Sequence, residues 1–144
     1  MNKWLPFALL PLGLVLLCLA PCLPHDLHLR TVEHRFREVA HPVRSRSLAH
    51  QSAIGALHGE GRLCDYYVGE LRAARLSAPE LKAFYEAQVV TLEVLEPPVP
   101  PRWLSSPDDL LRQAAVAMKP EPGELLYLLT LKEADPPGLD WRCN

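Results

Sequence analysis

Apolar side chains recur along the chain with helical spacing in some segments and with strand spacing in others. The first helical pattern covers residues 24–40, where Leu29, Val32, Phe36 and Val39 are three or four positions apart. This spacing places all four side chains on one face of a helix. We expect that face to pack on the rest of the domain; the alternative is a helix lying on anionic headgroups through the arginines of its other face.

Two further helices are predicted from capping signals. In residues 77–88, Ser77 precedes Glu80 by three positions and Pro79 falls in the first turn, which is typical of a helix N-terminus. The second helix begins at Ser106 and has two acidic residues in its first turn. Its predicted buried face consists of Leu110, Leu111, Ala114, Ala115 and Met118.

Three segments have the pattern of strands. Residues 63–76 have the aromatic and β-branched content of a strand, although Gly69 weakens the middle. Residues 89–96 alternate between apolar and polar side chains. Residues 124–132 are apolar on both faces, which predicts a central strand of the sheet.

The order of these elements predicts an α+β fold. We expect a small sheet of about three strands with two helices packed on one face, preceded by an N-terminal hydrophobic helix. Residues 45–61 are rich in Ser, Ala and Gly without a sustained period, so they are predicted to be a linker. The proline run at residues 97–101 is predicted to be a polyproline spacer.

The N-terminus carries an uncharged apolar run over residues 4–23, preceded by a single basic side chain, Lys3. Three interpretations fit this run: a signal peptide cleaved after Cys22, which we favour; a retained membrane anchor; and a lipoprotein acylated at Cys22. We therefore divide the chain into a signal peptide or membrane anchor (1–22), a basic, His-rich stalk or linker with an amphipathic helix (23–61), and a small disulfide-closed α+β domain (62–144).

All three interpretations predict an exported protein, either secreted or periplasmic or anchored to the membrane by residues 4–23. The arginines that follow the run favour the opposite orientation for a retained helix, so a cytoplasmic domain remains the minority alternative. In an oxidising compartment Cys64 and Cys143 form an even pair, and we predict a disulfide between them. The alternative is two separate buried thiols.

The charge of the chain bears on which classes of partner it can bind. The chain has a net charge of −2, which predicts no general affinity for nucleic acid. Residues 24–62 hold six arginines against four acids, whereas residues 63–144 hold eight basic and 13 acidic residues. The two parts of the chain therefore differ in the sign of their charge.

All six histidines lie at or before residue 58. His25 and His28 are three positions apart and could share a metal ion on a helix face, but a third ligand is hard to place. Exposed stalk residues are the simpler interpretation, so we predict no metal site and no cofactor. A metal-handling envelope protein that uses these N-terminal histidines is the alternative function.

Catalytic motifs are absent from the sequence. It contains no G-x-S-x-G, G-x-G-x-x-G or P-loop pattern, and no histidine follows residue 58 to serve as the base for a Ser or Cys nucleophile. We therefore predict that the chain is not an enzyme. The expected function is a small, non-enzymatic binding or interaction domain for an unknown protein or small-molecule ligand.

Overall fold

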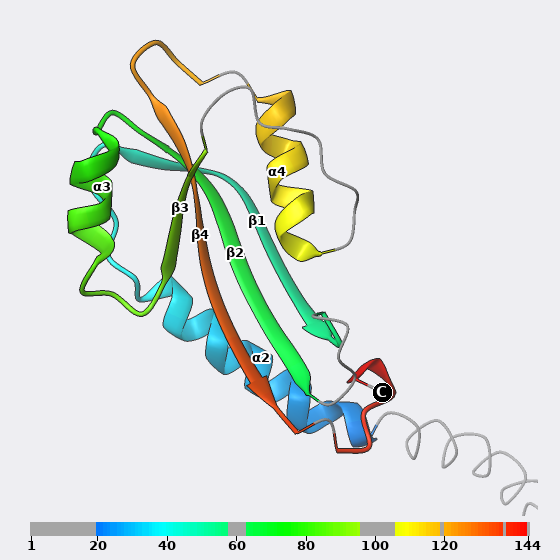
Figure 1. Ribbon diagram of the computed structural model, residues 1–144. Helices are drawn as coiled ribbons and strands as arrows, with labels where there is room; N and C mark the ends of the chain where they lie inside the picture. The colour runs from blue at the N-terminus through cyan, green and yellow to red at the C-terminus, as the bar shows by residue number, and fades with distance from the viewer. Residues whose placement is uncertain (1–19, 58–62, 96–105, 119, 137, 144) are drawn as a thin grey trace, which may run out of the picture.

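The computed structural model describes residues 20–57, 63–95, 106–118, 120–136 and 138–143. One antiparallel sheet of four strands, in the order β1-β2-β4-β3, forms the middle of the molecule, with helices on both sides (Figure 1). The strands are β1 (Ser45–Gly55), β2 (Cys64–Ala74), β3 (Thr91–Leu95) and β4 (Leu125–Asp135). The helices are α2 (Leu23–Arg37), α3 (Ala78–Tyr85) and α4 (Pro107–Ala117), with short 3-10 turns η1 (Ala20–Cys22) and η2 (Trp141–Cys143).

The two central strands, β2 and β4, pair along their whole length, from Cys64 opposite Asp135 to Ala74 opposite Leu125. Almost every residue of β2 is buried, and so is the middle of β4. The prediction of a central strand at residues 124–132 is confirmed. Its physical reason is that only a strand covered on both faces can bury a run that is apolar on both faces.

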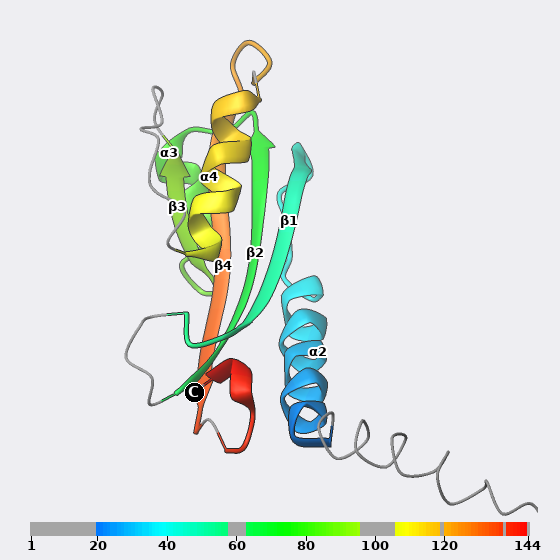
Figure 2. The same ribbon diagram turned by 90° about the vertical axis from the view of Figure 1, so that its right-hand side faces the viewer.

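The predicted arrangement of the helices was wrong. We expected the helices that begin at Ser77 and Ser106 to share one face, but α3 shares its face with α2, whereas α4 covers the opposite face (Figure 2). Alternate residues of β2 face the two layers: Tyr66 and Val68 pack with α2 and α3, and Tyr67 and Leu71 pack with α4. Because both central strands are apolar on both faces, each face of the sheet requires its own cover.

The strand count also differs from the prediction, because most of the predicted linker is a strand. Residues 45–55 form β1, which pairs antiparallel with β2 and places His50 opposite Glu70. As an edge strand, β1 has mostly half-buried side chains. Small and polar residues are therefore acceptable there, and its sequence does not alternate between apolar and polar residues. The α+β class and the three predicted strands are confirmed, with β1 as an additional strand.

The predicted amphipathic helix is confirmed as α2, and it packs on the sheet. Val32, Phe36 and Val39 are buried, and Leu29 is partly buried against the same core. The helix begins at Leu23, directly after η1, so Asp26 lies in its first turn.

The other two helices begin where the capping signals predict. In α3 the Glu80 carboxylate accepts hydrogen bonds from the backbone N–H and the hydroxyl of Ser77, at 2.8 and 2.5 Å. Asp109 accepts the equivalent bonds from Ser106 at the start of α4. The predicted buried face of α4 is correct for Leu111 and Ala115, whereas Leu110 is exposed.

Two predictions concern segments outside the described residues. These are the N-terminal hydrophobic helix, apart from residues 20–23, and the polyproline spacer at 97–101. Within the part of the chain that the structure describes, no helix is both long and apolar enough to cross a membrane.

Candidate functional site

The predicted cysteine pair comes together at one end of the sheet. Cys64 is the first residue of β2 and Cys143 lies in η2, and the structure joins them as a disulfide with their Cα atoms 4.8 Å apart. Both residues are fully buried. The tail is therefore tied to the central strand, as predicted. Trp141, in contrast, is exposed.

A polar cluster surrounds this disulfide and fastens α2 to the tail. Arg142 lies at its centre: its Nη2 donates to Oδ2 of the buried Asp140 at 2.6 Å, and its Nη1 donates to Oδ1 of Asp26 at 2.7 Å. Arg142 Nη2 also donates to the carbonyl oxygen of Cys22 at 3.2 Å, and the buried thiol of Cys22 is 3.5 Å from Asp140 Oδ1. The hydrogen bonds from Arg142 lower the pKa of Asp140 to about 2.

The two histidines considered as metal ligands have other partners. His25 Nδ1 contacts the hydroxyl of Tyr66, whereas the ring of His28 lies 3.2 Å from Glu133 Oε2 and 3.4 Å from Asp135 Oδ2. Among the described residues no group of three or more His, Cys, Asp or Glu side chains could hold a metal ion. His25 therefore contacts a core tyrosine and His28 contacts two acids of β4, so the two histidines do not share one set of partners.

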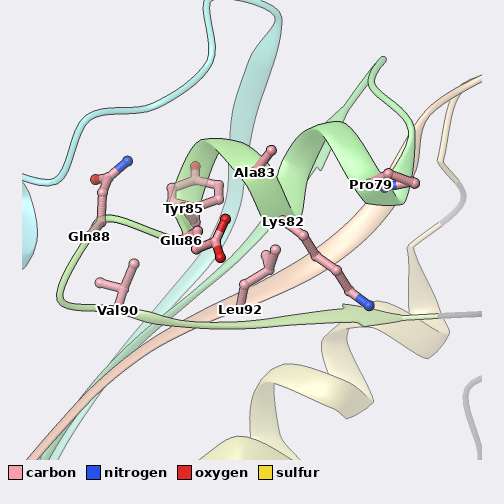
Figure 3. A pocket seen from close by; sticks show the side chains of 8 residues that line it. All are labelled: Pro79, Lys82, Ala83, Tyr85, Glu86, Gln88, Val90 and Leu92. Carbon is pink, nitrogen blue, oxygen red and sulfur yellow. The ribbon is translucent and has the colours of Figure 1, made fainter.

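A groove of about 530 Å³ lies at the other end of the molecule, between α3 and β3 (Figure 3). Its lining residues are Pro79, Lys82, Ala83, Tyr85, Glu86, Gln88, Val90 and Leu92. Lys82, Ala83 and Glu86 share one side of the helix, while Val90 and Leu92 are the half-buried apolar residues opposite them. The groove thus combines an apolar floor with two charged side chains.

Hydrogen bonds hold the inner wall of this groove. The hydroxyl of Tyr85 lies 3.1 Å from His41 Nδ1 and 3.4 Å from the hydroxyl of Tyr127 on β4. Burial, followed by the hydrogen bond to Tyr127, raises the pKa of Tyr85. Burial and the nearby Arg72 lower the pKa of His41, so the neutral imidazole is favoured. Because its pKa is raised, Tyr85 stays protonated. Its hydrogen bonds to His41 and Tyr127 fix the position of its ring.

Beside the groove, β3 forms one edge of the sheet. Within the described residues β3 pairs with β4 alone, from Thr91 opposite Thr130 to Leu95 opposite Leu126. An edge strand presents unpaired backbone N–H and C=O groups, which can hydrogen-bond to another extended segment. The open edge and the groove lie next to each other, because Leu92 belongs to both.

Two smaller hollows are less suited to a ligand. One, of about 370 Å³, is lined by arginines and by Glu121 and Glu124, but Arg46 and Arg75 already form ion pairs with these acids at 2.8 Å. Another, of about 330 Å³, contains His41, His50 and Glu70, and Glu70 pairs with Arg72 at 2.8 Å. In both hollows the charges are largely satisfied within the protein.

Sequence reasoning missed the groove. The pattern of residues 77–88 predicts which side of α3 is buried, but the position of α3 relative to β3 depends on long-range packing. One signal was available: Lys82, Ala83 and Glu86 leave one side of the helix without large apolar residues next to an alternating strand. Comparison of the chain with models of protein families, with curated proteins and with solved structures finds no match.

Proposed function

We propose that this chain is an exported protein whose disulfide-closed α+β domain works by binding a partner and not by catalysis. The binding site is the groove between α3 and β3, and its occupant is an extended peptide segment of a protein. The single observation that carries this proposal is the position of an apolar groove directly beside the open edge of β3.

Export is supported by the apolar run at residues 4–23 and by the disulfide, because such bonds persist in oxidising compartments. Binding without catalysis is supported by the kinds of side chain in the groove. Lys82 and Glu86 are exposed, and no Ser, Cys or His is among the lining residues. Such a surface can hold a ligand but lacks the Ser or Cys nucleophile and the His base of a nucleophilic site of that type.

An extended peptide fits this site because two kinds of contact are available at once. Its backbone can add to β3 as a further antiparallel or parallel strand, and every second side chain can then enter the groove over Val90 and Leu92. Within the described residues neither Lys82 nor Glu86 forms an ion pair, so both can pair with the ligand. We expect a preferred sequence with an apolar residue between charges of opposite sign.

The test uses peptides selected from a random dodecapeptide library displayed on phage. The variant Ala83→Trp places a large ring in the groove from an exposed position, so the core is left intact. The matched control is Ala87→Trp, because Ala87 is also exposed but does not line the groove. Selected peptides should bind the unmodified protein and the control alike, with at least a tenfold weaker affinity for Ala83→Trp by fluorescence polarisation.

Strand addition has its own measurement. When a selected peptide binds, amide hydrogen exchange should slow in residues 91–95, because the edge N–H groups gain partners. Peptides that bind Ala83→Trp as tightly as the control would place the site elsewhere. Slowed exchange at β1, with none at β3, would contradict the proposed edge.

A further inference from the structure

Exposed apolar side chains gather at the disulfide end of the molecule. Ten large apolar residues are exposed in the described part of the chain, and five of them lie at this end. The two most exposed of the five are Leu139 and Trp141, at 85% and 72% of their surface. The full set consists of Leu23, Leu27, Leu63, Leu139 and Trp141.

Contacts between the backbone segments bring these five residues to one end. Leu23 and Leu27 are one turn apart on α2 and flank Asp26, which is bonded to Arg142 of the tail. Leu63 precedes Cys64, whose disulfide holds the same tail. Figures 1 and 2 show the start of α2, the end of β4 and the C-terminal turn together at this end. We name these five residues the apolar end.

We infer that the apolar end rests on the surface of a lipid bilayer. The first reason is continuity: the uncharged apolar run at residues 4–23 joins the described structure here, through η1 and Leu23. This reason applies to the chain with the run retained as a membrane anchor, the alternative to the cleavage that we favour: the apolar end then lies within a few residues of the interface. Large apolar side chains beside such a segment gain free energy when they enter the interfacial region.

The chemistry of the surrounding side chains also favours lipid over a protein partner. Trp has an amphipathic ring that suits the headgroup level. Asp26 and Asp140 both pair with Arg142, which offsets one of their two negative charges. Arg30, one turn beyond Leu27, is exposed and can meet an anionic headgroup.

This inference does not depend on the groove, although it has a consequence for it. Helix α3, which forms one wall of the groove, lies toward the opposite end of the sheet (Figure 1). A domain that rests on lipid through the apolar end therefore presents the groove away from the membrane, where a soluble partner can reach it.

The test measures the depth of Trp141 with brominated lipids. The full chain, with Trp4→Phe and Trp103→Phe so that Trp141 is the single tryptophan, is reconstituted into phosphatidylcholine vesicles containing 0 or roughly 30% phosphatidylglycerol, a typical anionic surface. We expect quenching of Trp141 by bromines in the upper acyl chain, blue-shifted emission, and a stronger effect with the anionic lipid.

The matched control moves the single tryptophan away from the apolar end. Val89 is as exposed as Trp141, at 73% against 72%, so Val89→Trp in a Trp141→Phe background reports on the loop between α3 and β3. This tryptophan should remain unquenched. A further variant, Leu23→Glu with Leu27→Glu, should abolish the quenching of Trp141 while the chain remains in the vesicle fraction.

The contrary result is a Trp141 that stays unquenched in vesicles, with the emission of a water-exposed indole. That result would overturn lipid contact and leave the apolar end as a surface for a protein partner. Equal quenching at both positions would also overturn it, because the domain would then have no preferred orientation.

Discussion

Different interactions stabilise the two ends of the sheet. At the disulfide end a covalent bond joins two residues with a sequence separation of 79, and the ion pair between Arg142 and Asp26 joins two residues that are 116 positions apart. At the α3 end, Leu81 and Tyr85 pack on the core and a capping box starts the helix. The disulfide end closes the chain on itself, whereas the α3 end has a groove and a strand edge that pairs with no further strand among the described residues.

This difference teaches where such a small domain can place a binding surface. The large apolar side chains of the tail and of the start of α2 are exposed, so specific bonds hold these segments in place. The α3 end is stabilised by buried apolar area instead, which leaves nearby backbone and side chains available. The predictions below test this division of roles.

Removing the disulfide should have the largest effect. The bond closes a loop with a sequence separation of 79, for which the chain-entropy model gives about 4–5 kcal/mol. We expect Cys64→Ser with Cys143→Ser to lose about that much unfolding free energy in urea titrations. Cys22→Ser is the control, because this variant keeps the disulfide and should therefore still lose stability when reductant is added. If the double variant were as stable as the oxidised protein, the disulfide would not be what stabilises this end of the sheet.

Truncating the core at the α3 end should cost nearly as much. Leu81 is fully buried, and Leu→Ala changes at such sites cost about 2–5 kcal/mol. We expect Leu81→Ala to lose stability equally in oxidised and reduced protein, as measured by thermal unfolding. A loss that appeared only after reduction would mean that the two ends are not independent.

The Arg142 cluster should show a smaller effect that depends on pH. Asp140→Asn removes the negative charge and one acceptor oxygen opposite Arg142, which should cost about 1–3 kcal/mol at pH 7. The folded-state pKa of Asp140 is about 2, below its ordinary value. Its contribution is therefore complete above about pH 5 and is lost as the pH falls through 4 toward 2.

Urea midpoints measured from pH 7 to pH 2 check this sign. The difference between the wild type and Asp140→Asn should shrink steadily below pH 4. A constant difference across this range would show that the ionised carboxylate is not what stabilises the tail.

The capping boxes should have the smallest effect. Ser77→Ala removes the cap of α3, and such changes cost about 1 kcal/mol. Ser106→Ala tests the equivalent box of α4 on the other face. Calorimetry should show similar small decreases in melting temperature for both. A much larger loss for one of them would identify a role beyond capping.

Local signals in the sequence were sufficient for α2, α3, α4 and three of the strands. Capping residues, helical spacing and a doubly apolar strand are all visible within about a dozen residues. The disulfide was also predictable, because Cys64 and Cys143 were the only even pair outside the N-terminal run.

The remaining features depend on contacts between distant segments. β1 has no strong period of its own and is a strand because β2 provides hydrogen-bond partners. The side of the sheet that each helix covers follows from how β2 and β4 divide their apolar residues between two cores. The groove exists only after α3 and β3 are placed, so the identities of Ala83 and Leu92 could not predict it.

The burial of Cys22 has a consequence for proteolytic processing. We favoured cleavage after this residue, yet its thiol contacts Asp140 and its carbonyl accepts a hydrogen bond from Arg142. Cleavage there would remove the thiol and leave a new ammonium group on Leu23 close to the Arg142 guanidinium, where two positive charges repel. Cleavage before Ala20 would keep all of these contacts. The N-terminal residue of the mature chain therefore decides whether the tail keeps its attachment to α2.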